Sequence, residues 1–136
     1  MPDVLTPSQR SRCMAAIRSK DTTPERVVRR AVHRLGYRFR LHVRELPGTP
    51  DIVLPRHRKV VEVRGCFWHV HRCGRCRVPA TRRAYWAAKL RRTAARDAWN
   101  LRALRRLGWR VLVVWECQVT DPRRLEQIVR RFLAAG

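Results

Sequence analysis

Two carboxylates stand out in a chain that is otherwise poor in acidic residues. The sequence has 10 Asp and Glu against 32 Lys and Arg, and Asp51 and Glu62 belong to two short apolar runs joined by a turn. Carboxylates side by side on neighbouring strands would repel, and a hard divalent cation such as Mg²⁺ would remove that repulsion. The cation would activate water and neutralise charge developing on a phosphate, as phosphodiester hydrolysis requires. The alternative is an ordinary surface salt bridge with a nearby Arg.

A cluster of histidines and cysteines directly follows the second run. Residues 65–80 have no regular hydrophobic period, and Cys66, His71 and Cys73 are three candidate metal ligands within eight positions of this segment. Structural zinc takes four ligands, and the fourth could be Cys76, within the loop, or Cys117, which would hold the loop against the sheet. Small buried cysteines without a metal are the alternative. We expect zinc, because an irregular loop of this length needs internal support.

His69 and several aromatic residues could also act in chemistry or binding. A neutral imidazole beside a metal-bound water could accept its proton, so His69 is a candidate general base; a contact to zinc or phosphate is the alternative. Phe67 and Trp68 are consecutive, so in an extended segment at least one faces outward, where it could stack on bases. Trp86 could join them or pack in the core. Met14 could enter DNA from the opposite groove or anchor its helix.

The charge of the chain favours a polyanionic partner. The net charge is +22 and the pI is about 11.8. Coding bias could explain why only Lys20, Lys59 and Lys89 among the basic residues are Lys, but it does not explain the shortage of acids. We therefore expect nucleic acid as the partner, with salt-dependent binding. An anionic membrane surface is a weaker alternative, because no segment pairs a wide apolar face with an uninterrupted basic one.

Length and cysteine content narrow the class of protein further. A chain of 136 residues fits one domain with one core. Its apolar runs, such as 111–115, are far shorter than the ~20 residues of a membrane helix. The five cysteines are an odd number, which fits a disulfide framework poorly, and the N-terminal residues lack an apolar signal region. We therefore expect a cytoplasmic protein without membrane segments.

The hydrophobic pattern predicts a mixed α/β domain that would position these residues. Caps and helical spacing predict helices over 6–17, 23–35, 81–108 and from 121 onward, and shorter apolar runs predict strands over 37–41, 51–54, 60–63 and 109–116. The strands 51–54 and 60–63 should pair as an antiparallel hairpin, and 109–116 should lie in a sheet interior. On the long helix we expect a buried stripe of Trp86, Leu90, Ala94, Leu101, Leu104 and Leu107; on the last helix, Leu125, Ile128, Val129, Phe132 and Leu133. We interpret Trp99, Trp109 and Trp115 as packing residues.

Several sequence strings resemble those of the very-short-patch repair endonucleases, which belong to the restriction-endonuclease-like superfamily. The matching segments are LPGTPDIVLP, GCFWHVHRC, VPATRRAYW, LGWRVLVVWEC and the opening RSRCMAAIRSKDTTPE, so the resemblance covers nearly the whole chain. It implies a single nuclease domain over 1–136: a mixed central sheet flanked by helices, a DNA-contacting helix within 1–20 and a zinc-stapled loop over 65–80. It also implies nicking of DNA on the 5′ side of the thymine in a T:G mismatch left by deamination of 5-methylcytosine.

The resemblance also implies roles for individual residues. Asp51 would be the main Mg²⁺ ligand, assisted by the backbone carbonyl of Val63. His69 would be the general base, and Glu25 would orient His69 or the metal-bound water. The implied zinc ligands are Cys66, His71, Cys73 and Cys117, which favours Cys117 over Cys76. The implied DNA contacts are the intercalating Phe67, Trp68 and Trp86 and the minor-groove wedge Met14; we add Arg18, Lys20 and Lys89 as expected DNA-binding residues.

Two positions depart from the family pattern. Arg64 stands where the family has a second active-site histidine, and Glu62 stands where an apolar residue is usual. Arginine cannot act as a base, although it can hold a phosphate oxygen. Asp51 with Glu62 and Arg64 resembles the acidic, acidic, basic signature of the wider superfamily, in which Glu62 would bind the metal. Three functions therefore stay open: a Mg²⁺-dependent mismatch-nicking enzyme, a related endonuclease with another DNA target, and a zinc-stabilised DNA-binding module without catalysis.

The resemblance implies partners as well. Duplex DNA with a T:G mismatch would be the substrate, and the family cooperates with a cytosine methyltransferase and with mismatch repair proteins. A single nick needs a single active site, so we expect a monomer.

Overall fold

The computed structural model describes residues 22–65 and 82–135. Its elements, in chain order, are α2 (Thr23–Arg34), β1 (Arg40–Leu41), β2 (Ile52–Leu54), the 3₁₀ turn η1 (Pro55–His57), β3 (Lys59–Arg64), α3 (Arg83–Arg106), β4 (Arg110–Trp115), the 3₁₀ turn η2 (Glu116–Thr120) and α4 (Pro122–Ala134). The mixed α/β order that the sequence predicts is confirmed for these residues. The helix expected over 6–17 and the loop over 65–80, apart from Gly65, lie outside them.

The described strands form one mixed sheet in the order β1-β2-β3-β4. β2 pairs antiparallel with β1 and β3, which confirms the predicted hairpin, and η1 connects its two strands. β3 and β4 are parallel, with Lys59 opposite Arg110 and Arg64 opposite Trp115. A parallel pair needs a long crossover, and the segment containing α3 supplies it. The C-terminal ends of β3 and β4 therefore lie side by side at the same end of the sheet.

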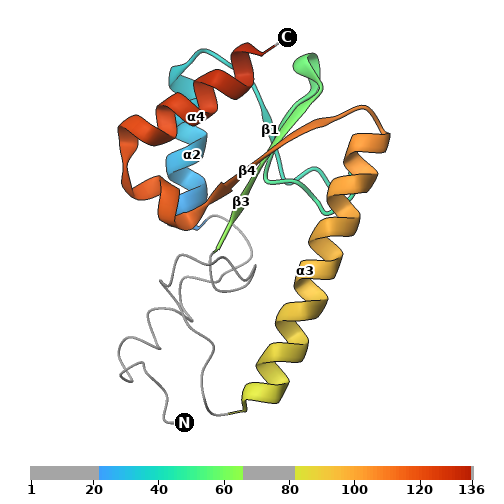
Figure 1. The fold of residues 1–136 in the computed structure, drawn as a ribbon. Helices are drawn as coiled ribbons and strands as arrows, with labels where there is room; N and C mark the ends of the chain where they lie inside the picture. Colours follow the sequence, from blue (N-terminus) through green and yellow to red (C-terminus); the bar gives the residue numbers. More distant parts are fainter. Residues whose placement is uncertain (1–21, 66–81, 136) are drawn as a thin grey trace.

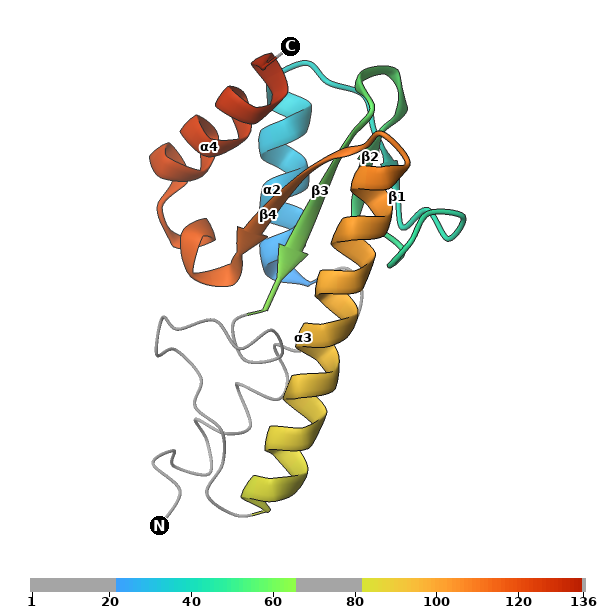
Figure 2. The same cartoon turned by 45° about the vertical axis from the view of Figure 1, so that its right-hand side comes forward.

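Helices cover both faces of the sheet (Figures 1 and 2). On one face, residues of α2 and α4 form a cluster with alternate sheet residues; its fully buried members include Val28, Ile52, Val61, Val114 and Val129. On the other face, the intervening sheet residues Val53 and Val60 pack with Leu104 of α3 and with Trp109. This two-residue alternation follows from the pleat of the strands. Burial of each such side chain contributes about 1.5–3 kcal/mol to folding.

Polar side chains fix the starts of α2 and α4 as the sequence predicts. The hydroxyl of Thr22, the residue before the expected start of α2, accepts a hydrogen bond from the Glu25 amide at 3.4 Å. The Asp121 carboxylate accepts hydrogen bonds from the amides of Arg123 and Arg124 at 3.2 and 3.3 Å. These bonds satisfy amide groups that have no partner within the helix.

The predicted strand over 37–41 is shorter than expected. Only Arg40 and Leu41 pair with β2, and in this register residues 37 and 38 lie opposite positions beyond the end of β2 at Leu54. Tyr37 and Phe39 nevertheless pack against the core under α2 and α4. The alternation of residue types therefore indicates burial correctly, while the strand pairing depends on the length of the neighbour.

The long helix α3 differs from its predicted packing. Of the six residues expected on its buried stripe, only Leu90 and Leu104 are buried, and Leu107 is 52% exposed. Trp99, interpreted as a packing residue, is 61% exposed, so that interpretation is wrong, whereas Trp109 is buried as expected. α3 extends well beyond the described sheet (Figure 2), so much of its length has no strand beneath it.

The last strand and helix also test the predicted packing. Among the described strands β4 pairs only with β3, so it lies at the edge of this sheet and not in its interior. On α4, Leu125, Val129 and Leu133 are buried as expected. None of the helices in the described part of the chain combines the length and apolar character needed to cross a membrane.

Candidate active site

Asp51 lies immediately before β2, across from the end of β3. One carboxylate oxygen, Oδ2, accepts a hydrogen bond from the Val63 amide at 2.8 Å. Burial raises the pKa of Asp51 from 3.8 to about 8; Glu25 and Glu62 act in the same direction, and the Val63 hydrogen bond opposes them. A carboxylate in such surroundings is unfavourable when ionised, and a bound cation would relieve this cost. The Val63 contact is made by its amide, whereas the role implied for Val63 concerns its carbonyl.

Glu25 is held beside Asp51 by donors on both of its oxygens. It sits in the first turn of α2 and is 2% exposed. Its Oε2 accepts a hydrogen bond from Arg29, one helical turn later, at 3.1 Å. Its Oε1 lies 2.6 Å from Nε2 of His42. Because both contacts fix the carboxylate, Glu25 keeps its orientation next to Asp51.

His42 is a site residue that the sequence analysis missed. It follows β1, and the pairing of Leu41 with Ile52 places it across from Asp51. Its backbone N–H donates a hydrogen bond to the Asp51 carbonyl at 3.2 Å. Its place beside Asp51 comes from the pairing of β1 with β2, which the residue types around it do not indicate.

These three residues form a candidate metal centre. Ligand atoms of Glu25, His42 and Asp51 all lie within 4.8 Å of one another. The buried Glu25 and the half-buried Asp51 provide carboxylate oxygens of the kind that a hard divalent cation prefers. Among the described residues, the donor set at this point therefore fits such a cation.

Glu62 and Arg64, the two departures from the family pattern, bind each other. Arg64 donates a hydrogen bond to Oε2 of Glu62 at 2.8 Å, and both side chains are mostly buried. The Arg64 guanidinium also lies 6.0 Å from the centre of the Trp115 ring. The salt bridge considered as an alternative for Glu62 is thus present, in a buried position and not on the surface. Glu62 is close enough to raise the pKa of Asp51, although less than Glu25 does.

Aromatic and basic side chains gather at the N-terminal end of α3. Lys89 lies 5.6 Å from the Trp86 ring and 5.8 Å from the Tyr85 ring, and Arg82 lies 4.3 Å from the Tyr85 ring. Tyr85 is 43% exposed. The two residues expected here to contact DNA, Trp86 and Lys89, are thus neighbours, and Tyr85 and Arg82 join them.

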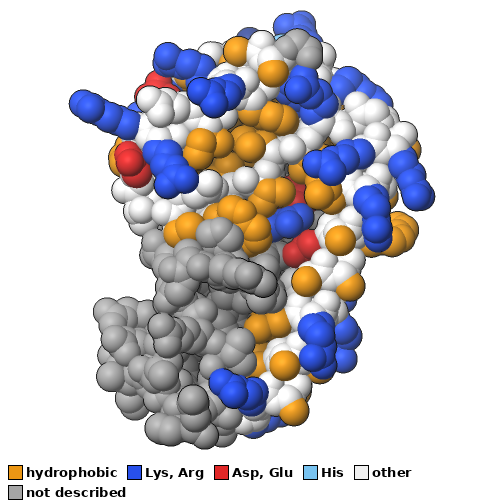
Figure 3. Space-filling view, in the orientation of Figure 1, with side chains coloured by type: hydrophobic (Ala, Val, Ile, Leu, Met, Phe, Trp, Pro, Cys, Tyr) orange, Lys and Arg blue, Asp and Glu red, His pale blue; other side chains and the backbone are white. Residues whose placement is uncertain are grey.

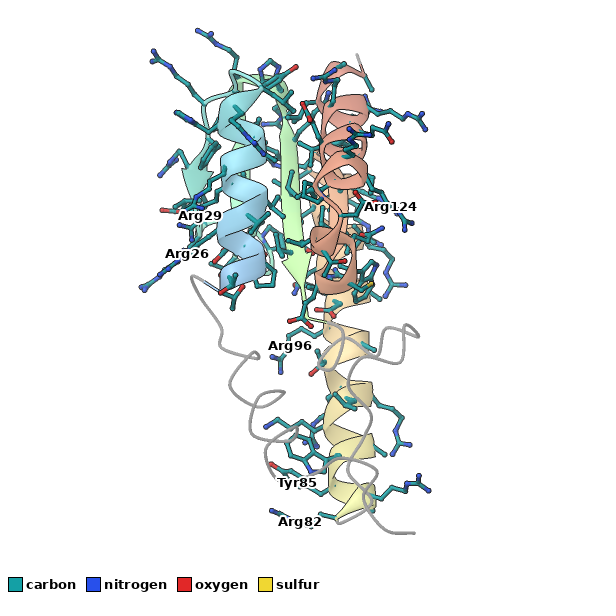
Figure 4. All side chains as sticks on the ribbon, turned by 90° about the vertical axis from the view of Figure 1, so that its left-hand side faces the viewer. Arg26, Arg29, Arg82, Tyr85, Arg96 and Arg124 are labelled. Atoms are coloured by element: carbon teal, nitrogen blue, oxygen red, sulfur yellow. The ribbon has the colours of Figure 1, made fainter. Side chains whose placement is uncertain are left out.

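Basic side chains are spread over the rest of the visible surface, where acidic ones are few (Figure 3). Figure 4 shows Arg26 and Arg29 extending from α2, Arg124 from α4, and Arg96 and Arg82 from α3. Such a distribution suits a phosphate backbone that contacts several elements at once.

Other predicted site residues can be placed only in part. Cys117 is half-buried in η2, two positions after the end of β4. Nine of the expected residues lie outside the described part of the chain: Met14, Arg18, Lys20, Cys66, Phe67, Trp68, His69, His71 and Cys73.

Comparisons with known proteins agree with the resemblance noted in the sequence. A family model described as DNA mismatch endonuclease Vsr matches residues 2–75. The chain is 48% identical over 133 residues to the type II nicking enzyme V.XorIIP of Xanthomonas oryzae pv. oryzae, covering 98% of each chain. It is 40% identical over 125 residues to the DNA mismatch endonuclease Vsr of Escherichia coli, covering 92% of this chain and 80% of that protein. It is 37% identical over 134 residues to the type II nicking enzyme V.NmeAIP of Neisseria meningitidis, covering 96% of each.

Proposed function

Because the chain belongs to the Vsr family of DNA mismatch endonucleases, we propose that it nicks duplex DNA on the 5′ side of the thymine in a T:G mismatch. The reaction would depend on Mg²⁺. The observation that carries this proposal is the close pair of carboxylates formed by the buried Glu25 and the half-buried Asp51, in a chain of net charge +22. A protein that only bound phosphate would have no use for them. Catalysis is therefore favoured over the non-catalytic DNA-binding module.

We assign each described residue of the site a separate role. Asp51 and Glu25 would hold Mg²⁺, which supplies a polarised water and charge neutralisation at the scissile phosphate. The Val63 amide keeps Asp51 in place through its hydrogen bond to Oδ2. Arg29 fixes Glu25 from within α2. His69, the implied general base, would then remove the proton of the attacking water.

We propose a supporting role for Arg64 at the phosphate. Its guanidinium stays charged at any physiological pH, so it can stabilise negative charge but cannot replace a histidine base. Arg64 is the last residue of β3, opposite Trp115 of β4, and its ion pair with Glu62 fixes its position there. Replacement of Arg64 by Ala should therefore slow nicking, and a variant that nicks at the parental rate would remove this role. We propose Glu62 as a further carboxylate near the metal. It raises the pKa of Asp51 less than Glu25 does.

A structural zinc ion is the second metal that we propose. The parallel register supports it: Arg64 and Trp115 are paired at the ends of β3 and β4. Cys117 comes two positions after Trp115, and the segment with Cys66, His71 and Cys73 begins two positions after Arg64. Elemental analysis of the purified protein should give one zinc per chain, reduced in Cys117→Ala.

Strand nicking of a labelled duplex with one T:G pair tests the proposed function directly. The matched duplexes carry T:A or C:G at the same position, and each reaction contains Mg²⁺ or EDTA. We expect a Mg²⁺-dependent nick 5′ of the mismatched thymine, and no nick by Asp51→Ala. The variant should still bind DNA, and its affinity should fall steeply with salt as the parent's does.

A second candidate is an endonuclease of the same family with another DNA target. Two of the relatives above are named type II nicking enzymes, and the pair Glu62 and Arg64 departs from the mismatch-repair pattern. Equal cutting of matched and mismatched duplexes would favour it. No cutting of any duplex despite tight binding would support the non-catalytic module. Cooperation of a monomer with mismatch repair proteins and a cytosine methyltransferase belongs to the first proposal only.

A further inference from the structure

His42 makes two contacts that join it to the carboxylate pair from different directions. Its backbone N–H binds the Asp51 carbonyl at 3.2 Å, and its imidazole Nε2 lies 2.6 Å from Oε1 of Glu25. Glu25 is 17 positions earlier in the chain, at the start of α2. His42 is thus the residue through which the edge of the sheet holds the helix that carries Glu25.

The backbone of His42 is in a conformation that is uncommon for residues with a β-carbon. Its φ is 48°, in the left-handed region where Gly is the usual residue and Asn, Asp and His are the commonest of the others. Such a conformation has a cost for a residue with a β-carbon, and it persists where surrounding contacts require it. At this position the required contact is the one between the imidazole and Glu25, since the backbone hydrogen bond to Asp51 needs no particular side chain.

The imidazole has a specific effect on the carboxylate. Glu25 is almost fully buried, so loss of the hydrogen bond from His42 would be unfavourable and would leave Oε1 less firmly held. With His42 on Oε1 and Arg29 on Oε2, the carboxylate instead stays beside Asp51. Two oxygen ligands fixed in this way are preorganised for one cation.

We propose that His42 is a positioning residue of the nuclease centre: by holding Oε1 of Glu25 it sets the affinity of the Asp51–Glu25 pair for a divalent cation. The inference rests on the proposed function, because it assigns the cation to this pair. It makes no demand on the DNA target, and it applies equally to mismatched and other substrates.

Two substitutions separate the side-chain contact from the backbone conformation. His42→Gln carries an amide nitrogen about as far from the backbone as Nε2, so it can still donate to Glu25. His42→Asn suits the left-handed backbone better than histidine does, but its amide is too short to reach Glu25. His33→Leu, at an exposed histidine on α2, serves as the matched control.

The primary measurement is Mn²⁺ binding by the full chain without DNA, followed by the loss of the free-ion signal in electron paramagnetic resonance. We expect the dissociation constant to rise about tenfold or more in His42→Asn and to stay within about threefold of the parent in His42→Gln and His33→Leu. The Mg²⁺ concentration for half-maximal nicking should shift by the same factors, and saturating Mg²⁺ should restore most of kcat in His42→Asn.

Other outcomes would overturn the inference or separate it from the proposed function. Parental Mn²⁺ affinity in His42→Asn overturns it, and so does an equal loss in the Gln and Asn variants, because the hydrogen bond would then not be responsible. Unchanged thermal unfolding of His42→Asn shows that any loss is local. If the parent nicks no duplex, the proposed function fails, while the Mn²⁺ titrations still decide the role of His42.

Discussion

Replacement of Asp51 by Asn should make the protein more stable at neutral pH, although it should also abolish nicking. Burial raises the pKa of Asp51 from 3.8 to about 8. Between these two values the folded state binds more protons than the unfolded state, so the free energy of unfolding falls as pH rises through the interval. Below the lower value both states are protonated, and above the upper value both are ionised. An Asn side chain has no charge to lose, and its oxygen can still accept the hydrogen bond from the Val63 amide.

The size of the effect follows from the same interval. One pH unit corresponds to about 1.4 kcal/mol for one proton, and pH 7 lies about three units above the unfolded value, which sets a ceiling of about 4 kcal/mol. Relaxation around the ionised carboxylate lowers this figure. For a domain of this size 1 kcal/mol corresponds to roughly 4 °C in Tm, so we expect Asp51→Asn to raise Tm by at least about 5 °C at pH 7.

Thermal unfolding of the parent and Asp51→Asn in EDTA, from pH 4 to pH 9, measures this gap. It should be small near pH 4, grow with pH and level off above pH 8. Glu126→Gln is the control, because Glu126 forms an exposed pair with Arg130 at 2.9 Å and should change stability by less than about 0.5 kcal/mol at any pH. Adding Mg²⁺ at neutral pH should raise the Tm of the parent but not of the variant. A gap that does not depend on pH, or a variant less stable than the parent at pH 7, would refute the reasoning.

Three further predictions concern the packing that supports the site. In urea unfolding, Trp109→Ala should lower the free energy of unfolding by about 3 kcal/mol and Trp99→Ala by less than about 1 kcal/mol, because Trp109 is buried and Trp99 is 61% exposed; similar losses would contradict the described packing of α3. Lys59→Met should cost about 2–4 kcal/mol in the same assay, because the Lys59 ammonium donates to the last carbonyls of α4, those of Phe132, Leu133 and Ala135. Its nicking rate per folded molecule should match that of the parent, and a selective loss of nicking would show another role. Gly48→Ala should lower Tm, because the backbone has φ +78° and a new Cβ would lie 2.8 Å from Nδ2 of Asn100; adding Asn100→Ala should recover only the steric part, and full recovery would mean that the backbone is not strained.

The sequence predicts the layers of this fold because each element buries its own face. Alternating or helical spacing of apolar residues is a local property, and it correctly places α2, the hairpin and α4 with their buried residues. The packing of α3 depends on which of its faces meets the sheet. Trp99 stands nine positions after the buried Leu90, about 180° around the helix, so it lies on the opposite face and is exposed.

The residues of the candidate site also differ in how far the sequence alone indicates them. Asp51 is recognisable in the sequence because it adjoins a turn, and its contact with Val63 follows from the hairpin. Glu25 is implied only by resemblance, since nothing in its own helix indicates a catalytic neighbour. His42 is missed because its importance comes from a strand register and a left-handed backbone, neither of which residue types reveal. Contacts between residues close in the hairpin are therefore accessible from the sequence, and contacts between the hairpin and α2 are not.

The strongly basic composition determines the electrostatic surroundings of the carboxylate pair. A net charge of +22 produces a field that attracts DNA and repels a free divalent cation. Exposed carboxylates in that field are matched by neighbouring arginines, as Glu126 is by Arg130. Glu25 also pairs with an arginine, Arg29, but it is 2% exposed, so its attraction for a cation is stronger and less screened than at the surface. Bound DNA then cancels the long-range repulsion, so each ligand should strengthen the binding of the other. The cation would thus be held most tightly when the substrate is in place.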